Sequence, residues 1–136
     1  MEIRLANVDD YLALLMVDHH INKDELALSI SLKRIYVAYE NEEFVGWLRY
    51  NLFWNQIPFI NMLYVMEDFR GQGYGIGLMN YFEKEMKKKY SKVMVSTQAN
   101  EYAQHFYDKI GYKAIGGFML PKEEYEVLMI KTLKRK

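Results

Sequence analysis

The chain has 136 residues, with 18 Lys or Arg against 18 Asp or Glu, and it has no cysteine. The neutral balance provides no global field for nucleic acid or an anionic membrane. The missing cysteine excludes disulfides, thiolate zinc sites and a cysteine nucleophile. A hydrophobic share of 51% is enough for a full core, so we expect a single domain over residues 1–136.

The N-terminal residues are polar and acidic, unlike a signal peptide, and no apolar stretch approaches the roughly 18 residues of a membrane span. We therefore expect a cytoplasmic protein. Hydrophobic periodicity then predicts a strand over 2–6, a helix from Asp9 or Asp10, a helix over 25–33, and strands over 35–39 and 44–54. The first helix has its apolar positions at Tyr11, Leu12, Leu15 and Met16.

The second half begins with residues 57–66, which are apolar on both faces and predict a central strand. A glycine-rich turn and a helix with apolar positions Leu78, Met79, Phe82 and Met86 follow. The remaining elements are a strand over 92–97, a helix that Asn100 caps and Gly111 ends, and strands over 112–119 and 125–133. The order βααβββαβαββ indicates an α/β protein with a mixed sheet flanked by helices.

The turn reads Arg70-Gly71-Gln72-Gly73-Tyr74-Gly75-Ile76-Gly77 and joins the central strand to a helix. Glycines there let the backbone approach a ligand closely, and the first turn of the helix offers unpaired N–H groups at a positive dipole end. The pattern predicts a phosphate cradle. It is not a Rossmann site, since too little chain remains for a second half, and no Gly-Lys-Ser/Thr follows to make a P-loop.

The sequence resembles the GNAT acyltransferase family, whose turn follows Arg/Gln-x-x-Gly-x-Gly/Ala, matched by Arg70, Gly73 and Gly75. A second segment, Asn100-x-x-Ala103-x-x-Phe106-Tyr107-x-Lys109-x-Gly111-Tyr112, looks like the companion cofactor segment of that family. The resemblance implies the GNAT fold, with acetyl-CoA or another acyl-CoA as cosubstrate and its pyrophosphate on N–H groups from Gly71 through Ile76.

The resemblance also implies roles for single residues. It assigns to the cofactor Leu63, Tyr64, Val65, Arg70, Gly71, Gln72, Gly73, Tyr74, Gly75, Ile76, Asn100 and Phe106. A backbone N–H of the strand over 63–65 would polarise the thioester carbonyl, and Tyr107 would protonate the departing thiolate. Three plainer readings stay open: Tyr107 as a core tyrosine, Arg70 as a solvated side chain, and Asn100 as a helix cap.

Two further positions depart from the family pattern. Many relatives place a Glu on or beside the central strand, whereas this strand carries Asn61 and reaches Glu67 only at its end. Glu67 is the candidate general base, and a water leading to solvent is the alternative. Met66 stands where many relatives have proline. No metal site is expected, because Asp18, His19 and His20 match no common ligand spacing.

The acceptor is a small amine, a peptide N-terminus or a protein lysine, and the sequence leaves all three open. By resemblance, the acceptor side would include the aromatic residues Trp47, Tyr50, Trp54, Phe118 and Tyr125. The expected reaction is direct attack of a primary amine on the thioester in a ternary complex. A catalytically inactive acyl-CoA-binding module is the alternative, a homodimer is left open, and no nucleic-acid or membrane partner is expected.

Overall fold

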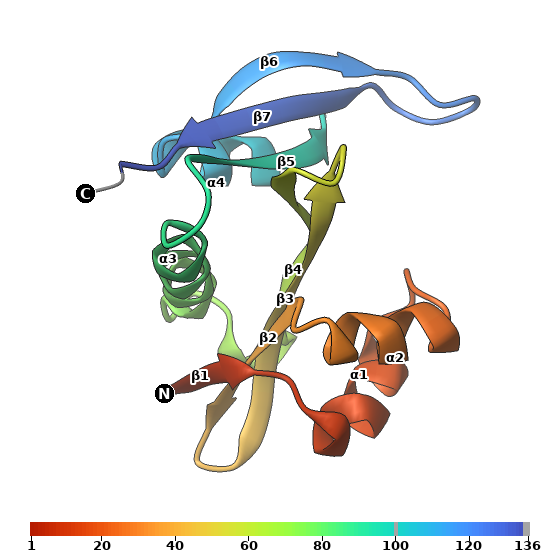
Figure 1. Ribbon diagram of the computed structural model, residues 1–136, viewed down its shortest axis with the longest axis vertical. Helices are drawn as coiled ribbons and strands as arrows, with labels where there is room; N and C mark the ends of the chain where they lie inside the picture. The colour runs from red at the N-terminus through yellow and green to blue at the C-terminus, as the bar shows by residue number, and fades with distance from the viewer. Residues whose placement is uncertain (100, 135–136) are drawn as a thin grey trace. The chain divides into compact units, whose positions relative to one another are not determined.

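The computed structural model describes residues 1–99 and 101–134 and has the expected order of elements (Figure 1). The strands are β1 (Glu2–Leu5), β2 (Ile35–Glu40), β3 (Glu43–Phe53), β4 (Ile57–Val65), β5 (Lys92–Gln98), β6 (Lys113–Phe118) and β7 (Glu126–Thr132). The helices are α1 (Tyr11–Val17), α2 (Lys23–Ser31), α3 (Tyr74–Met86) and α4 (Ala103–Lys109). Two short 3-10 turns, η1 (Val8–Asp10) and η2 (Glu67–Phe69), complete the described elements.

The strands form a seven-stranded mixed sheet in the order β1-β2-β3-β4-β5-β7-β6. The central position of β4 confirms what its two apolar faces predicted. Pairing is antiparallel for β1–β2, β2–β3, β5–β7 and β6–β7, and parallel for β4–β5, where Phe59 faces Met94 and Ile60 faces Val95. The final strand β7 lies between β5 and β6, so β6 stands at the end of the order.

The chain divides into two compact units, which are described separately. The first comprises residues 1–51 and 62–82, and the second comprises residues 52–61 and 83–136. The first therefore contains β1, α1, α2, β2, most of β3, the end of β4 and the start of α3. The second contains the end of β3, the start of β4 with the connection between them, and everything from the end of α3 onward. A single domain over 1–136 stays a prediction.

The core of the first unit is built around Leu14, Leu26, Ile35, Val37 and Trp47, each of them almost fully buried. The apolar face expected for α1 was partly wrong. Leu14 is completely buried, whereas Leu12 and Met16 are 70% and 77% exposed. Residues 11, 14 and 15 share one face of a helix and residues 12 and 16 another. Both faces are apolar, so the sequence pattern alone could not choose between them.

A capping box begins η1 in the same unit. The Asn7 side chain accepts a hydrogen bond from the Asp9 N–H at 2.9 Å, and Asp10 Oδ2 accepts from the Asn7 N–H at 2.8 Å. Asp10 is buried and also accepts from Arg4 at 2.7 Å and from the Tyr39 hydroxyl at 2.7 Å. These contacts tie the start of the helical segment to β1 and β2.

The second unit packs around Val93, Val95, Tyr112 and Met129, all buried. At its centre, Glu83 accepts from the Tyr112 hydroxyl at 2.8 Å and pairs with Lys131 at 2.7 Å. Helix α4 begins after Tyr102, which makes no side-chain cap bond. The expected cap, Asn100, lies outside the described residues. Gly111 follows the helix with a φ of +103°, a left-handed conformation that glycine adopts without steric cost.

Candidate cofactor site

The end of strand β4 lies against β3 at a glycine. A Cβ at Gly46 would meet the Tyr64 carbonyl oxygen, and the Met66 N–H donates to the Val45 oxygen at 2.7 Å. The Tyr64 carbonyl and the Met66 N–H therefore both lie against β3.

The glycine turn leaves room above its backbone. Gly71 and Gly73 have φ values of +76° and +88°, and nothing lies within 4 Å of a Cβ built on either residue. Left-handed φ values explain why glycine stands at both positions. The open space means that a ligand atom could approach the backbone where a side chain would otherwise stand.

Unpaired backbone donors gather at this turn. The Arg70 N–H donates to the Glu67 oxygen at 3.3 Å, and the next backbone bond in the described residues is from the Gly77 N–H to the Gly73 oxygen at 3.0 Å. Between them, the N–H groups from Gly71 through Ile76 have no backbone acceptor among the described residues. They stand at the start of α3, a helix of 13 residues whose dipole favours an anion here.

Arg70 is exposed, yet two contacts orient its guanidinium. Nε donates to the Val65 carbonyl at 2.9 Å, and Cζ lies 5.0 Å from the centre of the Tyr64 ring. The Val65 oxygen thus already accepts a hydrogen bond within the protein. Arg70 is neither simply solvated nor solely an anion contact, because it also fixes the strand end.

Tyr74 is the best-buried side chain of the turn, with 9% exposure. Its hydroxyl donates to Glu40 Oε2 at 3.0 Å, and its ring lies edge-on to Phe69 with the centroids 5.9 Å apart. The side chain therefore anchors the start of α3 to β2. That leaves the backbone of Tyr74 as the part that can bind a ligand.

Tyr107 lies in the second unit on α4 and is only 6% exposed. Its ring contacts the rings of Phe106 and Tyr112 at centroid distances of 5.2 and 5.5 Å. Burial, and to a smaller extent the charge of Glu101, raises the pKa of Tyr107 above its usual value. Among the described residues its hydroxyl has no hydrogen-bond partner, which leaves a protonated donor for use.

The structure brings together only some of the residues predicted from the sequence. The strand end over 63–65, Arg70 and the glycine turn are neighbours in the first unit. Glu67 lies in η2, between the strand end and Arg70 in the sequence, and is exposed. Phe106, which is half-buried, and Tyr107 belong to the second unit, and Asn100 lies outside the described residues.

Sequence reasoning missed a buried polar cluster at the end of α1. Asp18 is 3% exposed and accepts from Arg49 Nε at 2.9 Å and from Trp47 Nε1 at 3.1 Å. The neighbouring histidines, His19 and His20, are exposed. The one available signal was Arg49 itself, a charged residue in an otherwise apolar part of β3. In the described part of the chain, no three His, Cys, Asp or Glu side chains cluster as metal ligands would.

The aromatic residues expected on the acceptor side divide into two groups. Trp47 and Tyr50 are 1% and 9% exposed and belong to the core of the first unit. Trp54, Phe118 and Tyr125 are 75%, 42% and 41% exposed and belong to the second. Only the second group is available to a ligand.

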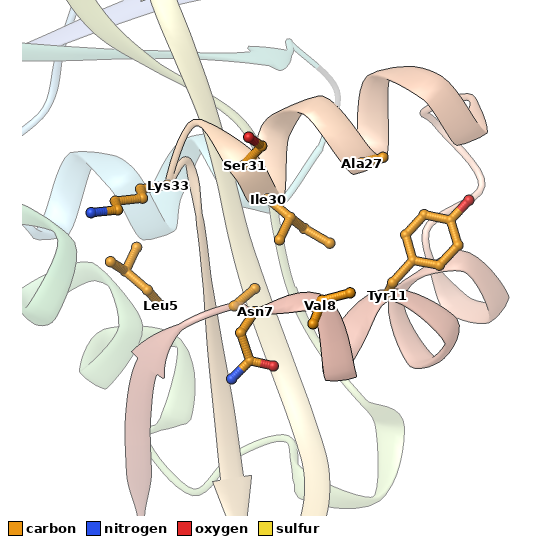
Figure 2. A pocket seen from close by; sticks show the side chains of 9 residues that line it. Leu5, Asn7, Val8, Tyr11, Ala27, Ile30, Ser31 and Lys33 are labelled. Atoms are coloured by element: carbon orange, nitrogen blue, oxygen red, sulfur yellow. The ribbon is translucent and has the colours of Figure 1, made fainter.

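An apolar groove of about 690 Å³ lies in the first unit between the β1–η1 segment and α2 (Figure 2). Its lining residues are Leu5, Ala6, Asn7, Val8, Tyr11, Ala27, Ile30, Ser31 and Lys33, and none was predicted as a site residue. Figure 2 shows Lys33 and Tyr11 toward opposite ends.

Comparisons with known proteins agree with this geometry. The sequence matches the acetyltransferase (GNAT) family over residues 6–112. Comparison with curated proteins gives no significant match. In the described residues, no helix is both long enough and apolar enough to span a bilayer.

Several solved structures share the fold at low sequence identity. The ribosomal-protein-S18-alanine N-acetyltransferase of Escherichia coli has a TM-score of 0.80 and 13% identity, covering 99% of this chain and 95% of that one. A GNAT acetyltransferase of Bacillus cereus has a TM-score of 0.80 and 22% identity, covering 98% of each chain. An aminoglycoside 6'-N-acetyltransferase complexed with coenzyme A has a TM-score of 0.81 and 18% identity, covering 100% and 99%. Since the family match extends over most of the sequence, this chain belongs to the acetyltransferase (GNAT) family.

Proposed function

We propose that the protein is an acetyl-CoA-dependent N-acetyltransferase that moves an acetyl group to a primary amine by direct attack in a ternary complex. The observation that carries the proposal is the run of N–H groups from Gly71 through Ile76, which find no backbone acceptor within residues 1–99 and 101–134, at a turn with open space over Gly71 and Gly73. Such a run at a helix N-terminus fits a pyrophosphate. A structural neighbour that is complexed with coenzyme A supports the same ligand.

Acetyl-CoA would supply an acetyl group activated as a thioester. In the proposed site, the N–H groups of Leu63 and Val65 are candidates to stabilise negative charge on the reacting carbonyl oxygen. The Val65 carbonyl would take no part in binding, since Arg70 already occupies it. The turn and the start of α3 would hold the pyrophosphate, with Gln72 and Ile76 contributing through their backbones.

Tyr107 is the proposed general acid. As the new C–N bond forms and the C–S bond breaks, its hydroxyl would give its proton to the thiolate sulfur. Burial keeps its pKa above the usual value, so the group is protonated at neutral pH. Glu67, exposed at the strand end, or a water leading to solvent would take the proton from the amine.

The acceptor remains the open part of the proposal. Neighbours with this fold include a ribosomal-protein-S18-alanine N-acetyltransferase and an aminoglycoside 6'-N-acetyltransferase. A small amine, a peptide N-terminus and a protein lysine are accordingly all worth testing. The alternative function is an inactive acyl-CoA-binding module, which the missing Glu on β4, where Asn61 stands, would favour. The cytoplasmic location and a homodimer stay predictions from the sequence.

Calorimetry with acetyl-CoA tests the proposal directly. Wild type should bind, and Gly73→Glu should not, because the new carboxylate would project into the open cradle and repel the phosphates. Gly116→Glu is a matched control, since Gly116 also has a positive φ, +150°, and no atom within 4 Å of a Cβ, but lies on β6. Failure of wild type to bind, or equal binding by both variants, would overturn the cradle.

A panel of amines with detection of released thiol then separates the two functions. Thiol release that depends on an added amine identifies a transferase and its acceptor class. Binding of acetyl-CoA without amine-dependent release from any of the three acceptor classes would favour the binding module instead.

A further inference from the structure

The side chain of Tyr64 contacts two other groups of the first unit. Its ring centroid is 5.1 Å from that of Trp47, with the planes tilted by 34°, and Arg70 Cζ lies 5.0 Å from the Tyr64 centroid. Tyr64 remains 41% exposed, so these contacts are not simply part of the core. The residue was assigned to the site for its backbone, yet its carbonyl lies against Gly46 of β3. Its side chain needs a separate account.

Trp47, the aromatic partner of Tyr64, is held by buried hydrogen bonds. Trp47 is 1% exposed, and its Nε1 donates to the Asp18 carboxylate at 3.1 Å. The same carboxylate is held by Arg49 Nε at 2.9 Å, with both side chains of the pair almost fully buried. The Trp47 ring therefore cannot easily rotate, and Tyr64 packs on a fixed surface.

Contacts with Val65 and Tyr64 orient the Arg70 side chain. Its Nε donates to the Val65 carbonyl at 2.9 Å, and its Cζ lies over the Tyr64 ring, 5.0 Å from the centroid. Among the described residues, its two terminal nitrogens have no hydrogen-bond partner. A guanidinium held by a hydrogen bond and by an aromatic ring loses less conformational freedom on binding an anion than a free one does.

We propose that Tyr64 is a positioning residue of the cofactor site, whose ring holds the Arg70 guanidinium so that its terminal nitrogens contact a phosphate of the acyl-CoA. This inference rests on the proposed function, because it needs a phosphate-bearing ligand at the glycine turn. Tyr64 touches no reacting atom in this scheme. It acts only through Arg70, and Trp47 and Asp18 act only by supporting the ring.

The test compares Tyr64→Leu, which removes the ring, with Tyr64→Phe, which keeps it. Affinities are measured by calorimetry for acetyl-CoA and by NMR titration for pantetheine, which lacks every phosphate. Tyr64→Leu should bind acetyl-CoA about two- to fivefold more weakly, the size expected for an exposed cation–π contact. Its affinity for pantetheine should not change, and Tyr64→Phe should bind both ligands like wild type.

A double-mutant cycle with Arg70→Ala separates positioning from a general effect on the strand. In the Arg70→Ala background, Tyr64→Leu should cause no further loss of acetyl-CoA affinity. Arg70→Lys keeps the charge without the planar edge and should lose affinity too. Because Arg70 is exposed, this variant should fold even if Tyr64→Leu does not.

Three results would overturn the inference: undiminished acetyl-CoA affinity in Tyr64→Leu, an equal loss for pantetheine, or additive losses in the cycle. Wild type that binds pantetheine but not acetyl-CoA, or that binds neither, would instead remove the phosphate cradle and the proposed function with it. The two failures are therefore distinguishable.

Discussion

Two polar regions of the first unit differ in whether their hydrogen-bonding groups have partners within the protein. Around Asp18, a buried carboxylate meets Arg49, Trp47 and the His20 N–H, and the described residues hold no buried side-chain nitrogen or oxygen without a partner. At the glycine turn, successive N–H groups have no backbone acceptor in the described part of the chain. Burying an unpaired polar group is costly, so donors are left over only where solvent or a ligand can reach them. The first region stabilises the fold, and the second is available for binding.

The largest expected effect is on the free energy of unfolding, from a change in the cluster around Asp18. Asp18→Asn removes the charge that balances the buried Arg49 guanidinium, and breaking such a pair should lower the free energy of unfolding by about 3–5 kcal/mol. Urea denaturation followed by circular dichroism measures it. Asp24→Asn, at an exposed position in the first turn of α2, should cost less than about 1 kcal/mol. Equal losses in the two variants would contradict a stabilising role for the cluster.

Tyr107 resembles the glycine turn, because its hydroxyl has no hydrogen-bond partner among the residues that the structure describes, although its ring is buried. Tyr107→Phe should lower kcat about a hundredfold by removing a general acid, with acetyl-CoA affinity nearly unchanged. Tyr102→Phe, at a 75% exposed position just before α4, is the control and should keep full turnover. Unchanged kcat in Tyr107→Phe would make Tyr107 a core tyrosine. Because its pKa is raised above the usual value of about 10, wild type should not lose this proton donor below about pH 10.

A pair of glycine variants compares the contact between β3 and β4, at Gly46, with the glycine turn, at Gly73. Gly46→Ala would place a methyl group against the Tyr64 carbonyl, and this overpacking between β3 and β4 should cost about 1–3 kcal/mol. Gly73→Ala meets no neighbouring atom and should cost only about 1 kcal/mol, from its φ of +88°. Thermal unfolding compares the two. The reverse ranking would mean that the turn, not the strand contact, is the tightly packed region.

The smallest effect concerns the partly solvated pair of Asp10 and Arg4. Burial alone would raise the pKa of Asp10, but hydrogen bonds from Arg4, the Asn7 N–H and Tyr39 together lower it. Its stabilisation is therefore present above the unfolded-state pKa of about 3.9 and is lost as the pH falls through the lower folded-state value. Asp10→Asn should cost about 1–2 kcal/mol at pH 7. The difference from wild type should shrink between pH 5 and pH 2, whereas a constant difference would show that the carboxylate charge is not responsible.

Much of the fold followed from local patterns. The continuous apolar run of β4 and the helical period of α3 depend on neighbours along the chain, so the elements and the central place of β4 were predictable from residues 57–86. The position of β7 between β5 and β6 was not, because strand order is decided by long-range pairing. The inward face of α1 was also unpredictable, since Leu12 and Leu14 are equally apolar and only packing distinguishes them.

For the candidate site, the sequence by itself determined the glycine turn, because several glycines between a strand and a helix are typical of a backbone that a ligand can approach closely. It determined in the same way the family resemblance, which the match over residues 6–112 confirms. Only the tertiary structure decided that the Val65 carbonyl is bound by Arg70, that the Tyr64 ring contacts both Arg70 and Trp47, and that Asp18 is buried. Each of these contacts joins separate elements of the fold, and local periodicity carries no information about which distant side chains will meet.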